Sequence, residues 1–567
     1  MIGLIAVTSA GRGAAHELAN AWPGETVLYE ETAAQSLPAA FAECSQVVAF
    51  LAAGAVIRLV SPLLKDKHTD PAVVCVDEGR HFAISLLGGH SGGANALAER
   101  VAEVLGVEPI VTTASDAVGI CALDQLGWPV EGDVAGVGRA MLDGESIGFS
   151  SEGIWPIPAL PENVAINEEP TSGRNQILVT DRLVESGPGL AVLRPPSLVV
   201  GVGASRGVSA DEVLELIDSL LADAQLSAHS VRHLATIDVK ADEVGLIEAA
   251  KRRGWTLHTY PATALVEVAV PNPSERVMAE VGTASVAEAS ALFGGGTLLV
   301  GKNKSHRDAP MATVAIARHD PRGRLAIIGL GPGARDLLTL RAKKELRRAS
   351  VVVGLDQYVE QIDDLLRPGT RLLATGLGNE EERARSAIAE AKKGYAVALI
   401  GSGDAGVYGM ASPALEDFDG TFDVVGVPGI TAATAASSLL GAPMGHDHCS
   451  ISLSDLHTRW PISEKRIKAA AEGDFVFSFY NPRSKGRDWQ LDSALTLLAE
   501  HRPETTPVGL VRAASRSGES VTVTTLGELV TTGTAAVDMF TLVLVGNSYS
   551  RLAAGQMVTP RGYGWKS

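Results

Sequence analysis

The feature that most constrains the fold of this chain is a series of apolar, strand-length runs that each end in a glycine-rich or polar loop. Four such loops follow one another in the last part of the chain, at residues 329–333, 401–410, 427–433 and 479–484. Glycine at a strand end lets the backbone take positive φ and approach a ligand closely. In open α/β sheets, ligands bind beyond the carboxyl ends of the strands. The pattern therefore predicts a ligand site built from several loops.

The first loop reads Gly-Leu-Gly-Pro-Gly and resembles half of a dinucleotide-binding fingerprint. The G-x-x-G half is missing, and Pro332 interrupts the helix start that would hold a pyrophosphate. For any single loop, an ordinary strand-to-helix turn is the alternative. Four loops in this order favour a shared site with polar groups, an apolar slot and an open side, which are what S-adenosylmethionine (SAM) needs.

The whole chain has the pattern of a multidomain α/β protein, because short Val/Ile/Leu runs alternate with segments of helical period. We expect strands at 3–8, 46–51, 72–76, 83–87 and 198–200 and a helix at 94–105. The 567 residues suggest three or four domains, which we place at 1–130, 131–195, 196–318 and 324–553, the last with two lobes. Residues 131–195 are rich in Gly and Pro and suit an extended small domain or connector better than a helix.

Charge and cysteine content limit the possible partners. The net charge of -18 argues against non-specific binding to nucleic acid or anionic lipid, since both need positive patches. The four cysteines form no C-x-x-C pair, so we expect no zinc ribbon, disulfide framework or Cys-ligated iron–sulfur centre. Reduced thiols suit a cytoplasmic protein, and the longest apolar run, 47–57, is shorter than the roughly 18 residues of a membrane span.

In their order and spacing, the four loops closely resemble the tetrapyrrole (precorrin) methylase family, whose members bind SAM between two α/β lobes. Residues 453–456, 481–487 and 545–548 resemble those of the precorrin-3B C(17)-methyltransferases, the ring-contracting enzymes of cobalamin biosynthesis. The resemblance covers essentially all of residues 324–553. It implies a two-lobed methylase fold, SAM as cofactor, a tetrapyrrole substrate and, as for related methylases, a homodimer.

Carried over by position, the resemblance implies that SAM is bound by Gly331, Pro332, Gly401, Ser402, Gly403, Asp404, Val407, Tyr408, Thr431, Ala432, Asn481, Ala513 and Gly546. Asp404 is expected to make a polar contact with SAM, and a loop-capping role is the alternative. The residues expected at the substrate are Asp455, Arg483, Ser484, Arg487 and Arg512. Lys485 and Arg516 are further candidates, because cations pair with the carboxylates of a precorrin; for each cation, solvated surface charge is the alternative.

Three histidines of the same region, His446, His448 and His457, lie near Asp447 and could in principle bind a metal ion. We favour a role in lining the tetrapyrrole cleft or capping turns, and predict no metal site.

The N-terminal half carries a second group of candidates. Residues 65–71 form its densest polar run, and residues 88–93 read Gly-Gly-His-Ser-Gly-Gly before a helix. This loop places the imidazole of His90 beside backbone N–H groups, which suits binding or polarising a carbonyl or carboxylate. Ser91 lies in no G-x-S-x-G elbow, so a serine hydrolase is not predicted. Residues 238–246 place alternating charges at a helix start, for which capping by acids is the alternative.

Residues 1–318 resemble the cobalt-precorrin-5A hydrolases, through 52–116 in the N-terminal part and 201–207, 238–246, 285–289 and Lys302 in the C-terminal part. That family opens the δ-lactone formed during ring contraction and releases acetaldehyde. The resemblance implies catalytic candidates among Lys65, Lys67, Asp70, His90, Lys240, Asp242, Glu243 and Lys302. A base among them could activate water, and a lysine or the loop amides could hold the leaving carboxylate.

Together the two resemblances predict a bifunctional enzyme. Two alternatives stay open: a methyltransferase whose N-terminal half only carries corrinoid intermediates, and a sensor that binds SAM or a tetrapyrrole without turnover. The sensor is less attractive because the sequence has no recognisable DNA-binding module.

Overall fold

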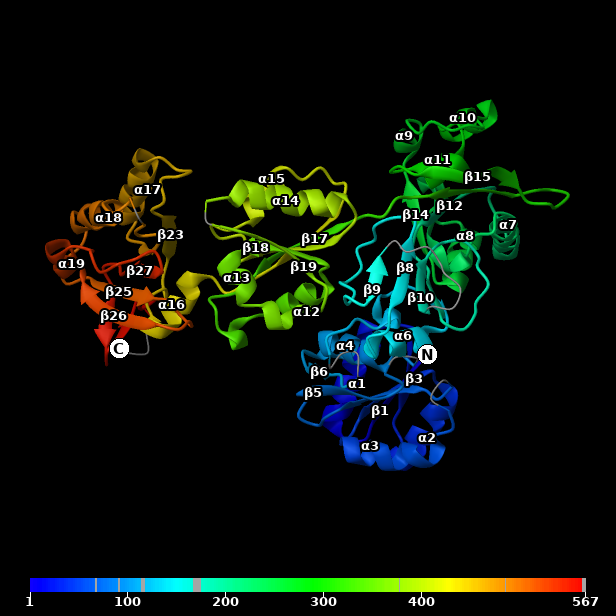
Figure 1. The fold of residues 1–567 in the computed structure, drawn as a ribbon, viewed down its shortest axis with the longest axis horizontal. Coiled ribbons are helices and arrows are strands. Elements are labelled where there is room, and N and C mark those ends of the chain that lie inside the picture. The colour runs from blue at the N-terminus through cyan, green and yellow to red at the C-terminus, as the bar shows by residue number, and fades with distance from the viewer. Residues whose placement is uncertain are drawn as a thin grey trace. The chain divides into compact units, whose positions relative to one another are not determined.

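The computed structural model describes residues 1–66, 69–89, 92–113, 118–166, 175–376, 378–484 and 486–562. The chain divides into two compact units, residues 1–321 with 367–369 and residues 322–366 with 370–567. Both units combine parallel or mixed sheets with helices (Figure 1), which confirms the multidomain α/β class.

The first sheet has the strand order β2-β1-β3-β4-β5-β6, and among its pairs only β4 and β5 are antiparallel. Its elements are β1 (Ile2–Ala6), α1 (Ser9–Ala21), β2 (Thr26–Tyr29), α2 (Ala33–Glu43), β3 (Gln46–Phe50), α3 (Ala53–Val60), β4 (Ala72–Val76), β5 (Phe82–Leu87), α4 (Ala94–Leu105) and β6 (Glu108–Ile110). Helices α1 and α4 pack on one face and α2 and α3 on the other. Strands buried on both faces appear in the sequence as continuous apolar runs, as β1, β3 and β4 do. The structure also has the predicted β5 and α4.

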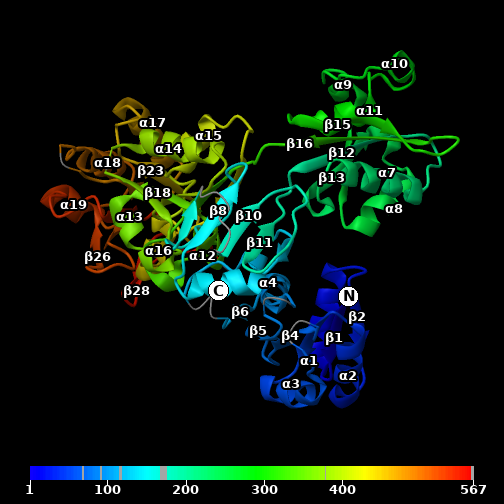
Figure 2. The ribbon, with the colours of Figure 1, turned by 45° about the vertical axis from the view of Figure 1, so that its right-hand side comes forward.

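A second sheet, of order β7-β11-β10-β8-β9, is formed by the Gly/Pro-rich stretch. Figure 2 shows β8, β10 and β11 side by side. Its elements are β7 (Val130–Gly132), α6 (Val134–Leu142), β8 (Ile147–Ser151), β9 (Val164–Ile166), β10 (Asn175–Val179) and β11 (Leu190–Leu193). The stretch thus forms a small domain around a sheet, and it also contains the helix α6, which its composition did not favour. The Asp133 side chain accepts the Gly136 N–H at 2.9 Å and caps this helix, and Val137 and Met141 bury its inner face.

The third sheet has the order β14-β13-β12-β16-β15, with β12, β13 and β14 parallel and the other pairs antiparallel. Helices α7 and α8 pack on one face and α11 on the other. The elements are β12 (Leu198–Ala204), α7 (Ala210–Asp223), β13 (Val231–Ile237), α8 (Val244–Arg253), β14 (Thr256–Tyr260), α9 (Ala262–Leu265), α10 (Glu275–Val281), α11 (Val286–Leu292), β15 (Thr297–Lys304) and β16 (Ala312–Arg318).

The second unit contains two lobes. The sheet of the first lobe is entirely parallel, in the order β19-β18-β20-β17-β21. Helices α14 and α15 cover one face and α12 and α13 the other (Figure 1). Its elements are β17 (Arg324–Gly329), α12 (Leu340–Arg348), β18 (Val351–Leu355), α13 (Asp356–Glu360), β19 (Arg371–Thr375), α14 (Glu380–Lys392), β20 (Ala396–Gly401), α15 (Ala411–Glu416), β21 (Asp423–Val427) and α16 (Ala432–Leu440).

The second lobe has a mixed sheet of order β23-β24-β27-β25-β26 and a small sheet of order β22-β29-β28. Helices α17, α18 and α19 pack on one face of the larger sheet, and α16 packs on the other. The elements are β22 (Gly441–Ala442), β23 (His448–Ser452), α17 (Trp460–Glu472), β24 (Val476–Tyr480), α18 (Gln490–Ala499), β25 (Pro507–Arg512), β26 (Ser520–Thr525), α19 (Leu526–Thr532), β27 (Thr541–Val545), β28 (Arg551–Ala553) and β29 (Gln556–Val558).

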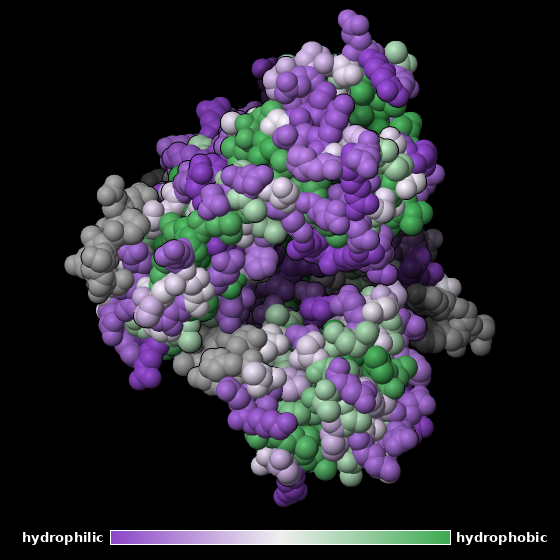
Figure 3. Space-filling view, turned by 90° about the vertical axis from the view of Figure 1, so that its right-hand side faces the viewer, coloured by the Kyte–Doolittle hydropathy of each residue, from purple (hydrophilic) through white to green (hydrophobic). Residues whose placement is uncertain are grey.

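The surface is mainly hydrophilic on the face shown in Figure 3, where apolar side chains gather in small groups. Among the described residues, no helix has both the length and the apolar character needed to cross a membrane. In the part of the chain that the structure describes, none of the four cysteines forms a disulfide bond.

Candidate functional sites

Three of the predicted loops meet at the carboxyl ends of the parallel strands β17, β20 and β21. The N–H of Leu330 donates to the carbonyl of Gly401 at 2.8 Å. Gly331 and Gly403 exchange two backbone hydrogen bonds, at 3.0 and 2.8 Å. The loops after β17 and β20 are therefore held together by their main chains, as the prediction of a shared site requires.

The glycines of these loops are in backbone-to-backbone contact. A Cβ added to Gly429 would lie 2.0 Å from the carbonyl oxygen of Gly403, and one on Gly329 would lie 2.6 Å from the same atom. Gly403 itself has a φ of +66°. Since no side chain fits in these positions, glycine is required for the three loops to approach one another.

Asp404 fastens two of the loops. Its Oδ1 accepts the N–H of Gly406 in its own loop at 2.8 Å, and its Oδ2 accepts the N–H of Gly429 in the loop after β21 at 3.0 Å. The structure thus gives this carboxylate the loop-capping role that was the alternative at this position. A direct contact with SAM stays a prediction.

Two side chains of the second lobe reach these loops. The hydroxyl of Tyr480 lies 2.7 Å from Thr431 Oγ1 and accepts the N–H of Ala433 at 3.0 Å. The guanidinium of Arg516 donates to the Pro332 carbonyl and the Ser402 hydroxyl. The sequence did not single out Tyr480, although its place at the end of β24, within one of the four predicted loops, pointed to it.

Other predicted SAM residues have unusual backbone conformations. Tyr408, Asn481 and Ala513 have φ values of 53°, 49° and 49°, a region that is sparsely populated for residues other than glycine and clusters at functional sites. The Tyr408 hydroxyl donates to the Ser450 carbonyl at 2.8 Å, and its ring centroid lies 5.1 Å from that of Tyr480. Burial raises the pKa of Tyr408.

Gly546 has its contacts within the second lobe. Its N–H donates to the Pro507 carbonyl at 2.9 Å, and its own carbonyl accepts from the buried Arg502. A Cβ at Gly546 would lie 2.4 Å from Cβ of Ser550. The glycine is therefore needed for packing, and its contact with SAM stays a prediction.

Three of the residues predicted at the substrate lie together after β24. Ser484 and Arg487 exchange backbone hydrogen bonds at 2.9 and 3.0 Å, and Arg487 Nε donates to Ser484 Oγ at 3.2 Å. Arg483 donates to Thr534 Oγ1 at 3.2 Å. Arg487 Nη1 is buried without a hydrogen-bond partner among the described residues. Lys485 lies outside the described residues.

Asp455 and Arg512 have separate protein partners. Asp455 Oδ2 accepts from Gln490 Nε2 at 3.1 Å. Arg512 Nε donates to Asp538 Oδ2 at 2.8 Å. Burial alone would raise the pKa of Asp538, but the hydrogen bonds from Arg512 and Thr541 hold it below its ordinary value. The positive charge of Arg512 is thus largely matched within the protein.

No group of three or more His, Cys, Asp or Glu side chains that could hold a metal ion occurs among the described residues. His446 Nδ1 accepts the Asp447 N–H at 2.8 Å, and His448 Nδ1 lies 3.2 Å from the His446 carbonyl. Both histidines thus make local contacts with the backbone of residues 446–448, as turn residues do.

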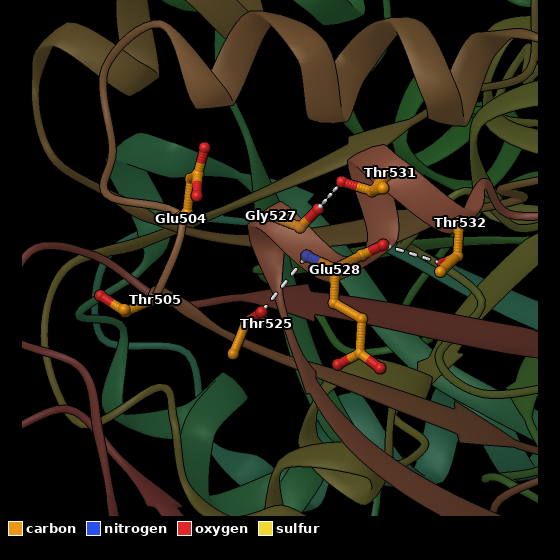
Figure 4. A pocket seen from close by; sticks show the side chains of 7 residues that line it. All are labelled: Glu504, Thr505, Thr525, Gly527, Glu528, Thr531 and Thr532. Atoms are coloured by element: carbon orange, nitrogen blue, oxygen red, sulfur yellow. Dashed lines mark hydrogen bonds between the residues drawn. The ribbon is translucent and has the colours of Figure 1, made fainter.

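A hollow of about 380 Å³ lies beside α19 (Figure 4), lined by Glu504, Thr505, Thr525, Gly527, Glu528, Thr531 and Thr532. Thr525 Oγ1 accepts the Glu528 N–H, and the hydroxyls of Thr531 and Thr532 donate to backbone carbonyls of the same helix. The hydroxyls of Thr525, Thr531 and Thr532 therefore make hydrogen bonds with backbone groups of α19.

In the first domain, the structure partly describes the predicted polar loops. Lys67 and His90 lie outside the described residues. The Lys65 N–H donates to Asp70 Oδ2 at 2.9 Å, so Asp70 closes its own loop. Beside the Gly-Gly-His loop, the buried Asn95 accepts from Ser85 Oγ at 2.7 Å and donates to Thr113 Oγ1 at 3.2 Å.

In the third sheet, Lys240, Asp242 and Glu243 lie in the loop after β13, beside Arg206 and Gly207 of the loop after the neighbouring strand β12. Oε1 of the buried Glu243 accepts the Gly207 N–H at 2.9 Å. Its Oε2 has no hydrogen bond among the described residues and lies 3.8 Å from Lys240 Nζ and 3.9 Å from Arg206.

The charges of this cluster are unevenly matched. Burial lowers the pKa of Lys240 even though Glu243 opposes the shift. The more exposed Asp242 accepts from Arg206 at 2.5 Å, which lowers its pKa. A lysine of lowered pKa beside a strand-end loop is a recognised mark of a functional site.

Lys302 belongs to a different group of contacts. Its N–H donates to Oε1 of the buried Glu288 at 3.0 Å, and its Nζ donates to the Asn272 carbonyl at 2.7 Å. Burial alone would raise the pKa of Glu288, but hydrogen bonds from Asn272 and Lys302 hold it low. Lys302 thus closes a loop around a buried carboxylate.

Comparison with known families identifies three matching regions. Residues 324–530 match the model of the tetrapyrrole (corrin/porphyrin) methylases. Residues 35–116 match cobalamin synthesis G N-terminal, and residues 198–317 match cobalamin synthesis G C-terminus.

Among known proteins, the chain is 47% identical to the probable cobalt-factor III C(17)-methyltransferase of Salmonella typhimurium over 242 residues, which are 42% of this chain and 99% of that protein. It is 34% identical to the cobalt-precorrin-5A hydrolase of Priestia megaterium over 298 residues, which are 47% of this chain and 78% of that protein. The crystal structure of the methyltransferase CobJ is 37% identical and covers 42% of this chain and all of its own, with a TM-score of 0.40.

Proposed function

The chain belongs to the tetrapyrrole (corrin/porphyrin) methylases and, in its N-terminal half, to the cobalamin synthesis G families, and from this premise we propose that it is a bifunctional enzyme of corrin ring biosynthesis. Its C-terminal unit uses SAM to methylate C-17 of precorrin-3B or cobalt-precorrin-3 with ring contraction. Its N-terminal unit opens the lactone of cobalt-precorrin-5A and releases acetaldehyde. The functional unit is a cytoplasmic homodimer.

The observation that carries the methyltransferase proposal is the meeting of three glycine loops at the carboxyl ends of parallel strands. Bound SAM supplies an electrophilic methyl group. Ser402 and Asp404, both partly exposed, would supply polar groups for its ribose and amino-acid parts, and the half-exposed Tyr408 suits an apolar moiety. We expect Arg483, Ser484 and Arg487 of the second lobe to bind carboxylates of the macrocycle.

The relatives support a substrate that carries cobalt. The Salmonella protein that matches over nearly its whole length is named for cobalt-factor III, and the Priestia protein for cobalt-precorrin-5A. The two activities would then act on one route, with one methylation between them, and their fusion would keep scarce, labile intermediates near one another.

In the N-terminal unit, the cluster around Glu243 suits lactone opening. Water adds to the lactone carbonyl, the acyl–oxygen bond breaks, and the proton of water goes to the departing alkoxide. Lys240 and Arg206 provide positive charge for the carboxylate that forms, while Glu243 holds them in place. Release of acetaldehyde then needs the alcohol to lose its proton as the carbon–carbon bond to the macrocycle breaks, with the electron pair kept by the macrocycle.

The test is acetaldehyde release from cobalt-precorrin-5A by the purified chain, compared with a variant that lacks residues 1–318. We expect release by the full chain alone and transfer of labelled methyl from SAM to cobalt-factor III by both. Methyl transfer without acetaldehyde release from the full chain would support the alternative, in which the N-terminal half only carries corrinoid intermediates. Tight binding with neither reaction would support a sensor.

A further inference from the structure

The connection between β25 and β26 places one charged side chain of the second lobe against the loops of the first lobe. Arg516 Nε donates to the Pro332 carbonyl at 2.5 Å, and Nη2 donates to Ser402 Oγ at 2.6 Å. Pro332 and Ser402 belong to two different loops of the predicted SAM site. The guanidinium also lies 6.0 Å from the ring centroid of Tyr358. A single side chain thus fastens both loops.

The backbone conformation on both sides of this contact, in the connection between β25 and β26 and at Gly333, allows the Arg516 side chain to reach the loops. Ala513 and Ser515, in the same connection, have left-handed φ values of 49° and 62°, and the Ser515 N–H donates to Glu519 Oε2 at 2.6 Å. On the other side, a Cβ on Gly333, whose φ is +139°, would lie 2.6 Å from Cγ of Arg516. Left-handed residues other than glycine persist only where surrounding contacts hold them. The connection is therefore shaped to deliver Arg516 to this place.

We propose that Arg516 is a positioning residue for the methyl donor, and that it acts by holding the Pro332 carbonyl and the Ser402 hydroxyl at the mouth of the SAM site. This inference rests on the proposed SAM-dependent methyl transfer. It assigns Arg516 to SAM, whereas the sequence left open two roles for this residue, binding of tetrapyrrole carboxylates and solvated surface charge. Because Arg516 comes from the second lobe and the loops that it holds come from the first, affinity for the methyl donor depends on residues of both lobes.

The test uses the full chain and S-adenosylhomocysteine as the probe, with Kd measured by calorimetry in the absence of tetrapyrrole. Arg516→Ala removes two hydrogen bonds from a charged donor, so we expect Kd to rise by about tenfold or more. Arg516→Lys keeps the charge but not the fork that reaches two acceptors, so we expect an intermediate rise. Arg551→Ala, at an exposed arginine of β28, is the matched control and should bind like the wild type.

Steady-state kinetics separate this role from a general structural one. We expect Arg516→Ala to raise KM for SAM while KM for the tetrapyrrole stays at the wild-type value. Wild-type Kd in both Arg516 variants, or a rise only in KM for the tetrapyrrole, would overturn the inference and leave the proposed function intact. If Arg516→Ala does not fold, wild-type Kd in folded Arg516→Lys overturns the inference in the same way. A wild-type chain that binds no S-adenosylhomocysteine and transfers no methyl group would refute the proposed function itself.

Discussion

A buried histidine of the third sheet makes the stability of that domain depend on pH. His233 lies on β13 with 8% of its surface exposed, and its Nε2 is buried without a hydrogen-bond partner among the described residues. Its ring stacks on His258, with centroids 4.1 Å apart. Burial above all lowers the pKa of His233 to about 4, and the positive charges of His258, Arg232 and His319 add to the shift.

The magnitude follows from linkage between protonation and folding. An ordinary histidine has a pKa of 6.5, which is the value in the unfolded chain. As the pH falls, the unfolded chain therefore binds this proton at a pH about 2.5 units higher than the folded chain does. At 1.36 kcal/mol per unit, the neutral His233 contributes about 3 kcal/mol. Because the folded pKa is the lower one, this stability is fully present above pH 6.5. It is lost as the pH falls from 6.5 to about 4.

The assay is hydrogen exchange of the β13 and β14 amides in the full chain, at pH values from 7 to 4, for the wild type and His233→Phe. Phenylalanine keeps a ring to stack on His258 and removes the titratable, unpartnered nitrogen. We expect the opening free energy of the wild type to fall by about 3 kcal/mol more than that of the variant. Burial also lowers the pKa of His319, which titrates in both proteins, so the difference between them reports the titration of His233 together with its coupling to His319. Equal pH dependence in the two proteins would refute the reasoning.

Two further substitutions test the candidate sites. Glu243→Gln removes the carboxylate that partly offsets the effect of burial on Lys240, so the pKa of that lysine should fall further. The pH dependence of Lys240 acylation, followed by mass spectrometry, should therefore shift to lower pH. Acetaldehyde release should fall by about tenfold or more. An acylation profile that does not shift would show that Glu243 has no effect on the pKa of Lys240. Gly429→Ala places a Cβ 2.0 Å from the Gly403 carbonyl and should weaken S-adenosylhomocysteine binding by about tenfold or more, whereas Gly426→Ala, where no atom lies within 4 Å of the added Cβ, should bind normally.

The parallel sheets were the part of the fold that sequence patterns could predict. The residues of β1 and β4 are buried throughout, and such strands appear as unbroken apolar runs followed by turn residues. For the same reason the loops after β17, β20 and β21 could be expected to meet, because parallel strands bring their carboxyl ends to one edge.

The second sheet was harder to predict because its strands are short and its order depends on distant pairing. β7 pairs antiparallel with β11, about 60 residues away, and Gly132 enters that pairing with a φ of +80°. The helix α6 contains two glycines, which lower helix propensity. It forms because Asp133 caps it and its apolar face packs on the sheet, and neither contact is visible in local composition.

Side-chain partners within the candidate sites were the least predictable feature. The family resemblance made Asp404 a candidate and its charge made Arg516 one, but their roles depend on which loops the fold brings near. Asp404 binds a loop 25 residues away, and Arg516 binds loops 114 and 184 residues away. Since a carboxylate or guanidinium has the same chemistry whether it meets a ligand or a backbone group, sequence alone could not choose between the two.

The packing of the three glycine loops explains why the second lobe contributes to the site of the first. Where Gly329, Gly403 and Gly429 touch, no side chain can be present to discriminate among ligands. The backbone groups of these glycines are largely used within the protein, since Gly403 exchanges hydrogen bonds with Gly331 and the Gly429 N–H donates to Asp404. Selectivity must therefore come from side chains at the rim, and Tyr480 and Arg516 bring such side chains from the second lobe. A site built in this way makes methyl-donor binding depend on both lobes, so a change in the second lobe that binds the acceptor also alters the donor site.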